Sequence, residues 1–434
     1  MKKLQRRASF ALILAGALLL GLAFYVFRYF RDGKSWALSP VSADYYSGGV
    51  LRAGTLTDRN GLVLARAADG QRTYAEDAET RVSCLHAVGD YEGYIGAGAL
   101  RLFADELSGY DPVQGAYESG GGVVALSLDA ELQKAAYAAL AGQSGAVALC
   151  NYRTGELLCM VSSPAYDPVF GPAADAEGVY VNRVTGAAYT PGSVFKLVTL
   201  CAALEKLDDL RTRSFFCAGE TEIGGVTVKC SGVHGRQTIE EAFANSCNCA
   251  FAALSLELGA DTLAAYARQL GLTDGLSLCG AAVVPGSFEK AAAGSASLAW
   301  SGIGQYTDLV TPYAMLRLSA AIAAGGTVRE PTLLRDGKSE TSVVLDADTA
   351  KEMADMMRYN VVSRYGDWIA PGLPLCAKTG TAELGDGTSH GWFTGFLQDE
   401  AHPYAFVVVV EHGGGGLSAA APVASRLLQT AAAD

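Results

Sequence analysis

Hydrophobic residues follow several distinct patterns along this chain, and the first is an uncharged run near the amino terminus. Residues Ala8–Phe27 contain no charged side chain. A helix of that length rises about 30 Å, the thickness of the hydrocarbon core of a bilayer. A cleaved signal peptide would have a shorter apolar region that ends in small residues, whereas bulky side chains follow Phe24. We therefore expect an uncleaved membrane anchor over residues 8–27.

Charges beside the run indicate its orientation. Four Lys or Arg side chains precede the run. Three Lys or Arg side chains and one Asp follow it, in the residues up to Lys34. Because Lys and Arg are enriched on the cytoplasmic side of membrane helices, we expect residues 1–7 to be a cytoplasmic tail. The rest of the chain would then lie outside the cell membrane.

Apolar runs near both ends of the remaining chain predict a single sheet. Residues 130–141 have the spacing of an amphipathic helix, and residues 419–430 form an Ala-rich segment typical of a second helix. The predicted strands are Ala146–Cys150, Leu157–Val161, Leu373–Ala377, Trp392–Leu397 and Tyr404–Glu411. Mainly helical sequence separates the first two strands from the last three. This order predicts an α+β fold, in which an antiparallel sheet is closed by the two ends of one domain and carries helices on its faces.

The segment before this domain has a different character. Residues 36–122 contain short strand-like runs and turns and end at Ser119–Gly122, a Gly-rich sequence typical of a linker. We expect a small amino-terminal module over residues 36–122, followed by the main domain over residues 123–434.

Composition and charge exclude other classes of protein. Of the 434 residues, 50% are hydrophobic and 18% are charged, which excludes a disordered chain. The net charge is −12, whereas nucleic-acid-binding domains are usually basic.

The ten cysteines give weaker indications. Cys217 and Cys230 flank a loop that contains three glycines and are the best candidates for a disulfide. Cys247 and Cys249 lack a second Cys/His pair at the usual zinc spacing, so we expect no metal site. No organic cofactor is expected either.

Three short motifs carry the candidate chemistry. They are Ser193-Val194-Phe195-Lys196, Ser246-Cys247-Asn248 and Lys378-Thr379-Gly380-Thr381, in that order. The first pattern also occurs at Ser287–Lys290, so it is weak by itself. The ordered set of three is far more specific.

The surroundings of the two Ser-x-x-Lys copies differ. Lys196 is the sole charged residue between Arg183 and Glu205, in a segment apolar on all sides. Such a helix is buried, and burial favours the neutral amine that can accept a proton from Ser193 one turn away. Ser287 instead lies beside Glu289 in an Ala-Gly-rich segment. We therefore expect Ser193 to be the nucleophile and Lys196 the base.

The other two motifs supply groups for a peptide substrate. Ser246 and Asn248 lie between two predicted helices, where a plain turn is the alternative interpretation. A hydroxyl there can relay a proton, and an amide can hold a peptide. Lys378 and Thr379 offer a cation and a hydroxyl for a carboxylate, and Gly380 allows close approach of another backbone. The backbone N–H groups of Ser193 and Thr381 are candidates for an oxyanion hole.

With these motifs the sequence resembles the class B penicillin-binding proteins, membrane-anchored D,D-transpeptidases of peptidoglycan synthesis. Further blocks in the family's order are RAGTLTDRNG, SLDAELQKAAYAAL, CMVSSPAYDP, NRVTGAAYTPGSVFKLVT, HGRQTIEEAFANSCNCAF, SGIGQYTDLVTPYAML and HGWFTGF. The resemblance implies the β-lactamase/transpeptidase-like fold. It implies that Ser193 attacks the penultimate D-Ala carbonyl of a stem peptide with Lys196 as base and Ser246 as proton relay. Asn248 would hold the donor peptide, and Lys378 and Thr379 its carboxylate.

The resemblance also implies partners: peptidoglycan stem peptides, β-lactam antibiotics and a separate SEDS-type glycan polymerase in the membrane. Gln305 and His390 lie in matching blocks, where we expect structural hydrogen bonding, and His234 is a weaker functional candidate. The alternatives are a membrane-tethered β-lactamase, a D,D-carboxypeptidase and a drug sensor. The role in elongation, division or sporulation, the acceptor amine and the oligomeric state stay open.

Overall fold

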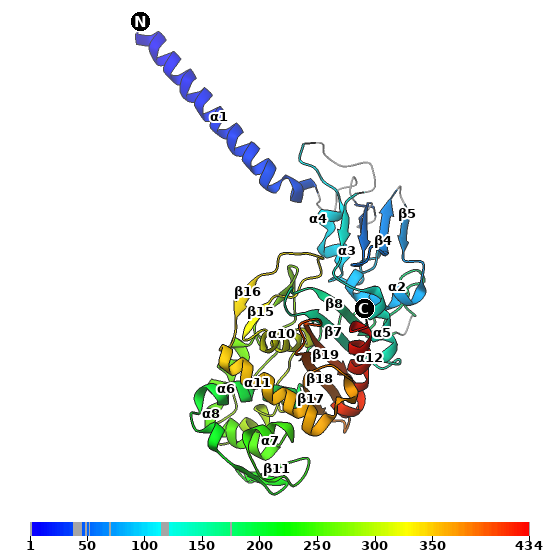
Figure 1. The fold of residues 1–434 in the computed structure, drawn as a ribbon. Coiled ribbons are helices and arrows are strands. Elements are labelled where there is room, and N and C mark those ends of the chain that lie inside the picture. Colours follow the sequence, from blue (N-terminus) through cyan, green and yellow to red (C-terminus); the bar gives the residue numbers. More distant parts are fainter. Residues whose placement is uncertain are drawn as a thin grey trace.

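The computed structural model describes residues 2–37, 46–47, 50–51, 53–68, 71–113, 121–173 and 176–433. Helix α1 (Lys2–Ala37) extends away from the rest of the chain, and its apolar side chains are exposed (Figure 1). By length and composition, α1 is the one helix among the described residues that is suited to crossing a membrane.

A small sheet follows α1 and belongs to the amino-terminal module. Its strand order is β5-β4-β3-β6, and β6 runs parallel to β3 while the other neighbours are antiparallel. The elements of this part are β1 (Tyr46–Ser47), β2 (Val50–Leu51), β3 (Gly54–Thr57), β4 (Val63–Ala68), β5 (Gln71–Tyr74), α2 (Ala78–Val88), α3 (Ala99–Leu102), α4 (Ala104–Leu107) and β6 (Val123–Ala125). The expected linker at residues 119–122 lies partly outside the described residues. Residues 123–125 add a strand to the small sheet before the chain enters the main domain.

The main sheet has five antiparallel strands in the order β17-β18-β19-β7-β8. They are β7 (Gly145–Asn151), β8 (Leu157–Ser163), β17 (Leu375–Glu383), β18 (Ser389–Leu397) and β19 (Tyr404–Val410). β19 pairs with β7, from Tyr404 opposite Asn151 to Val410 opposite Gly145. The sheet is therefore closed by the two ends of the domain, as the sequence predicts, and β17 is an edge strand.

Helices cover both faces of this sheet because its central strands are apolar on both sides. In β19, Phe406 and Val408 lie in one core with α5 (Ala130–Ala139) and α12 (Ala421–Ala431). Val407 and Val409 point the other way, into the core that includes α10 (Pro312–Ala323). This alternation follows from the two-residue period of a strand. The α+β prediction and both predicted terminal helices are confirmed.

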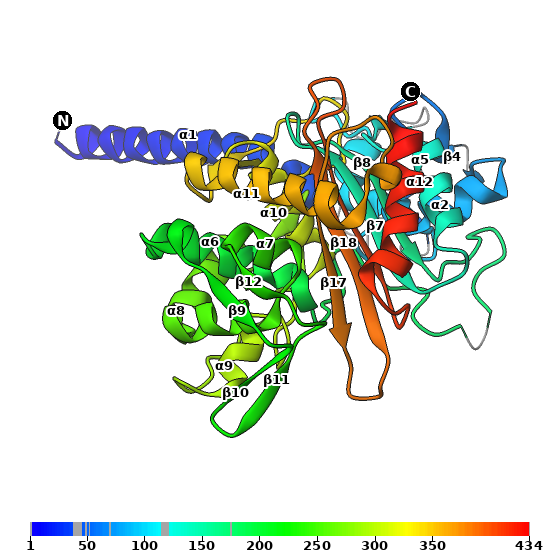
Figure 2. The same ribbon diagram turned by 60° about the horizontal axis from the view of Figure 1, so that its bottom comes forward.

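A helical region lies between β8 and β17 and carries the first two motifs. Figure 2 shows α6, α7 and α8 together on one side of β17 and β18, with α5 and α12 on the other. Its helical elements are η1 (Gly192–Phe195), α6 (Lys196–Lys206), η2 (Leu210–Thr212), α7 (Ile239–Ala244), α8 (Asn248–Gln269), α9 (Ala296–Ser301), α11 (Ala347–Asn360), η3 (Val361–Tyr365) and η4 (Asp367–Ile369); η5 (Gly416–Ala420) precedes α12. The short paired strands are β9 (Phe215–Cys217), β10 (Glu220–Ile223), β11 (Val226–Lys229), β12 (Gly235–Gln237), β13 (Ser277–Leu278), β14 (Ala281–Ala282), β15 (Thr327–Arg329) and β16 (Thr341–Val343).

Candidate active site

Ser193 and Lys196 meet where a single 3-10 turn becomes a buried helix. Ser193 lies on η1, and Lys196 is the first residue of α6, in which every residue from 196 to 204 is buried. Lys196 Nζ lies 3.2 Å from Ser193 Oγ. The i, i+3 spacing thus places the amine at hydrogen-bonding distance from the hydroxyl, as predicted.

The contacts of Lys196 favour a neutral amine. Its side chain is 0% exposed, and burial lowers its pKa to about 7 against an opposing effect of the Cys230, Cys247 and Cys249 thiols. Nζ donates hydrogen bonds to the Ser246 carbonyl oxygen at 2.6 Å and to Asn248 Oδ1 at 2.8 Å. A neutral amine has two N–H bonds and one lone pair. The two acceptors use both N–H bonds, so the lone pair remains for a proton from a neighbouring hydroxyl.

The second motif forms a strained turn between α7 and α8. Thr238 and Glu241 make a capping box at the start of α7. Ser246 has a φ of 49°, which is uncommon for a residue with a side chain and is found at functional sites. Its hydroxyl lies 3.2 Å from Lys196 Nζ and 3.1 Å from Lys378 Nζ. Ser246 therefore joins the two lysines and is suited to passing a proton.

Asn248 is positioned at the same turn. Its Oδ1 accepts from Lys196, and its Nδ2 donates to the Lys229 carbonyl oxygen at 2.8 Å. Both ends of this amide thus contact the protein, and its expected contact with a peptide stays a prediction.

The third motif lies on the edge strand β17. Lys378 is 0% exposed, and burial together with the Lys196 charge lowers its pKa. Lys378 Nζ donates to the Thr379 carbonyl oxygen at 2.8 Å. Thr379 lies 3.2 Å, through its Oγ1, from the hydroxyl of Tyr365. Tyr365 was not anticipated, because it precedes Thr379 by fourteen residues and ends η3, an element with no sequence signal.

Two glycines allow η1 to touch β17. Gly192 has a φ of 55°, and a Cβ there would lie 2.5 Å from the Thr381 carbonyl oxygen. A Cβ on Gly380 would lie 2.8 Å from the Pro191 carbonyl oxygen. Only glycine fits such an approach, which brings the backbone of Ser193 beside that of Thr381.

Replacing Gly192 with alanine is expected to separate these two segments. The new Cβ would clash with backbone and would occupy a left-handed conformation, so we expect a loss of about 1–3 kcal/mol in stability and slower acylation by penicillin. Thermal unfolding and penicillin acylation rates measure both effects. Gly224→Ala is a matched control, because Gly224 also has positive φ (58°) but has only one atom near its Cβ position, at 3.9 Å. Equal acylation by the two variants would contradict the packing argument.

The second Ser-x-x-Lys copy does not form a pair. Ser287 Oγ donates to the Thr307 carbonyl oxygen at 3.2 Å, and Lys290 Nζ lies 2.8 Å from Asp261 in an exposed ion pair. The Lys290 amine is thus paired to a carboxylate at the surface, unlike the buried Lys196 amine beside Ser193.

Gln305 and His390 lie beside the third motif. Gln305 Nε2 donates to the Thr381 carbonyl oxygen at 3.4 Å. His390 Nδ1 accepts from the backbone N–H of His412 at 3.2 Å, and burial lowers its pKa. These are structural contacts of the kind expected from the sequence.

The cysteines differ from the sequence-based expectation. All ten are free thiols, including Cys217 and Cys230. Cys217 Sγ lies 3.6 Å from Cys249 Sγ, and Cys230 Sγ lies 3.8 Å from Cys247 Sγ. The predicted Cys217–Cys230 disulfide is therefore absent, because the fold directs both side chains into a larger group of sulfur atoms beside the second motif.

The sequence of this chain matches a protein-family model and several known proteins. The family model described as the penicillin binding protein transpeptidase domain matches residues 145–429. The chain belongs to this family. Its resemblance to class B penicillin-binding proteins is thereby confirmed. The chain is 28% identical over 383 residues to the peptidoglycan D,D-transpeptidase PbpA of Mycobacterium tuberculosis, a match that covers 76% of this chain and 75% of that protein. It is 30% identical over 316 residues to the probable transpeptidase FtsI of Caulobacter vibrioides, covering 68% and 52% of the two chains.

Solved transpeptidase structures share the fold. The crystal structure of PBPA from M. tuberculosis has a TM-score of 0.77 at 25% identity and is covered completely by 88% of this chain. The structure of the same protein as its ceftriaxone acyl-enzyme complex has a TM-score of 0.75 at 26% identity. The match covers 87% of this chain and 98% of the chain in that structure. The transpeptidase domain of a peptidoglycan glycosyltransferase from Eggerthella lenta has a TM-score of 0.74 at 28% identity, over 88% and 98% of the two chains.

Proposed function

We propose that the protein is a peptidoglycan D,D-transpeptidase that works through an acyl-enzyme on Ser193 and is inhibited covalently by β-lactams. The observation that carries this proposal is the fully buried amine of Lys196, 3.2 Å from Ser193 Oγ and from Ser246 Oγ, in a chain of this family.

In the acylation step, Ser193 Oγ attacks the carbonyl carbon of the penultimate D-Ala of a stem pentapeptide. The hydroxyl proton passes to the neutral Lys196 amine. The backbone N–H groups of Ser193 and Thr381 stabilise the tetrahedral oxyanion. Lys196 then returns the proton through the Ser246 hydroxyl to the leaving amine, and D-Ala departs. An amine from a neighbouring stem then attacks the ester carbon and forms the cross-link amide. The bond to Ser193 Oγ breaks, and the proton that the amine loses passes through Lys196 to restore the Ser193 hydroxyl.

The edge strand provides the substrate-binding surface. A stem peptide in extended form can add to β17 through main-chain hydrogen bonds, with Asn248 on its other side. Lys378 and Thr379 bind the terminal carboxylate, beside which Lys378 keeps its proton. Its charge then favours the neutral form of Lys196, so substrate binding prepares the base.

The acylation rate is expected to depend on pH through Lys196. Because burial lowers the Lys196 pKa to about 7, the amine is protonated and inactive below that pH and neutral above it. The charged and titratable groups around it are Lys378 and the three thiols Cys230, Cys247 and Cys249. The second-order rate constant for penicillin acylation should therefore rise with pH and level off above about 7. A rate that is constant across this range, with the fold intact, would contradict a titrating base.

We further propose that α1 is an uncleaved anchor with its amino terminus in the cytoplasm and the catalytic domain outside the membrane. Excess Lys and Arg before the apolar run support this orientation. A separate SEDS-type polymerase would supply the glycan strands.

Incubation of the detergent-solubilised full chain with uncross-linked pentapeptide glycan tests the reaction. We expect free D-Ala and cross-linked stem dimers in equal amounts. D-Ala release without dimers would indicate a D,D-carboxypeptidase, and rapid turnover of penicillin would indicate a β-lactamase. Either result would overturn the proposal.

A further inference from the structure

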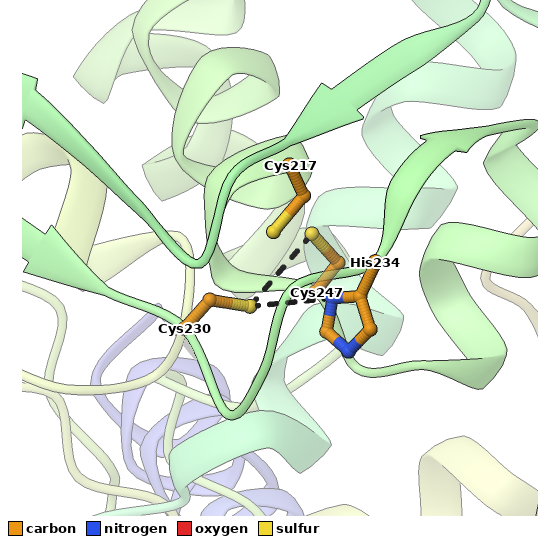
Figure 3. A group of neighbouring side chains, drawn as sticks. All are labelled: Cys217, Cys230, His234 and Cys247. Atoms are coloured by element: carbon orange, nitrogen blue, oxygen red, sulfur yellow. Dashed lines mark hydrogen bonds between the residues drawn. The ribbon is translucent and has the colours of Figure 1, made fainter.

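Four potential metal ligands converge beside the second catalytic motif (Figure 3). They are Cys217, Cys230, His234 and Cys247, and their ligand atoms all lie within 4.8 Å of one another. Cys217 ends β9, Cys230 follows β11, His234 precedes β12, and Cys247 caps α8. We propose that this group binds a structural zinc ion through three thiolates and one imidazole.

The distances match the coordination sphere of zinc. Around a tetrahedral ion with Zn–S bonds of about 2.3 Å and Zn–N bonds of about 2.0 Å, two sulfurs lie about 3.8 Å apart and a sulfur and a nitrogen about 3.5 Å apart. Cys230 Sγ lies 3.8 Å from Cys247 Sγ and 3.5 Å from His234 Nδ1. Cys230 Sγ therefore lies at ligand spacing from two other members of the group, and the remaining ligand atoms lie within 4.8 Å of one another.

The chemistry of the ligands selects zinc. Thiolate and imidazole ligands suit zinc and not magnesium or calcium, which prefer oxygen. Four protein ligands close the coordination sphere, as in structural sites, and leave no open position for catalysis. The backbone N–H of Asn248 donates to Cys230 Sγ at 3.2 Å. Such an outer contact stabilises a thiolate and orients it.

The local packing alone provides little stability to this part of the fold, so a bound ion would stabilise it. The small core beside the motif consists of Cys217, Ala242, Cys247, Cys249 and Ala250, with Phe215 and Cys230 at its edge. These side chains bury little apolar area, and the neighbouring strands β9 and β12 pair over only three residues each. Small units of this kind commonly depend on a metal for stability.

The site is joined directly to the catalytic groups. Cys247 lies between Ser246 and Asn248, both of which bind Lys196. Zinc at Cys247 would fix the strained turn at Ser246 and with it the acceptors that orient the Lys196 amine. Cys217, Cys230, His234 and Cys247 are therefore positioning residues that act through the turn.

The spacing of these four ligands along the chain does not reveal the site. Zinc-site patterns are read from two pairs of ligands at short spacing, whereas two of these four ligands, Cys217 and Cys247, are single residues from different elements. Among the four, only Cys230 and His234 lie close together in the sequence. Cys217 and Cys247 lie further away on either side of this pair, so no spacing pattern connects all four.

Metal analysis of the detergent-solubilised full chain tests the proposal. The protein is purified under reducing conditions without chelators from zinc-supplemented cells, and bound metals are measured by mass spectrometry. We expect about one zinc ion per chain. His234→Ala should lose it, because His234 supplies one ligand, and His234→Cys should retain it through four thiolates.

Cys249→Ser is the matched control, since its sulfur lies 3.6 Å from Cys217 Sγ but lies outside the four-ligand group. It should keep its zinc. Three results would overturn the proposal: a metal-free wild-type chain, retention of zinc by His234→Ala, or loss of zinc by Cys249→Ser. The intact mass of the wild-type chain is measured as well. A mass lower than that of the free-thiol chain by two hydrogens per cysteine pair would show disulfides in place of the ion, and would also overturn the proposal.

Removal of the ion also tests the connection to catalysis. Stripping zinc with a chelator should lower the penicillin acylation rate and the unfolding temperature, and added Zn²⁺ should restore both. A normal acylation rate in the stripped protein would contradict the positioning role. Metal content is measured independently of activity, so failure of the transpeptidase proposal would leave the test of the site intact.

Discussion

Ser193→Ala is expected to abolish covalent labelling by penicillin while the protein remains folded. The substitution removes the hydroxyl that forms the ester. The side chain is half-buried, and among the described residues its hydroxyl is hydrogen-bonded to Lys196. Its loss should therefore change stability by less than about 1 kcal/mol.

Labelling with a fluorescent penicillin, together with thermal unfolding, measures this effect. Ser287→Ala is the matched control, because Ser287 begins the other Ser-x-x-Lys sequence and contacts only the Thr307 carbonyl oxygen through its hydroxyl. It should label normally. If labelling survived in Ser193→Ala and disappeared in Ser287→Ala, the nucleophile would be Ser287 and the assignment to Ser193 would be wrong.

Lys196→Arg is expected to slow acylation by about 10²–10⁴-fold, the usual contribution of a positioned base. Guanidinium keeps its proton at any pH that the protein survives. Arginine therefore preserves the positive charge but removes the lone pair that receives the Ser193 proton. The measurement is the second-order rate constant for acylation by penicillin.

Lys378→Arg is the matched control, because Lys378 is equally buried and also contacts Ser246 Oγ. Its proposed role requires only a cation, so its loss of rate should be smaller. Circular dichroism and thermal unfolding show whether each variant folds around the larger guanidinium. Lys196→Met adds a neutral side chain of similar length and should be as slow as Lys196→Arg. Near-wild-type acylation by either folded Lys196 variant would end its assignment as the base.

Much of the fold follows from sequence patterns with strong physical causes. The strands β7, β8 and β19 contain continuous apolar runs because they are covered on both faces. Likewise, the single lysine in the apolar segment around residue 196 indicates a buried amine, and the structure places it with no exposed surface.

Other features depend on contacts between distant segments and leave no local pattern. Tyr365 reaches Thr379 from the end of η3, and its position is set by the packing of α11 on β17. The cysteine group likewise depends on how the β9–β12 strands fold over α7 and α8. Spacing along the chain predicted a Cys217–Cys230 disulfide, but tertiary structure brings both residues to Cys247 and His234.

The central claim is that Ser193 forms the acyl-enzyme, and peptide mapping of the wild-type chain after brief exposure to penicillin tests it most directly. Intact mass should increase by one penicillin per chain, because acylation opens the β-lactam ring without a leaving group. After digestion, fragmentation should place the adduct on Ser193, in the peptide that contains Thr190–Lys196. An adduct on Ser287 or Ser246, or a chain that never gains mass, would contradict the account.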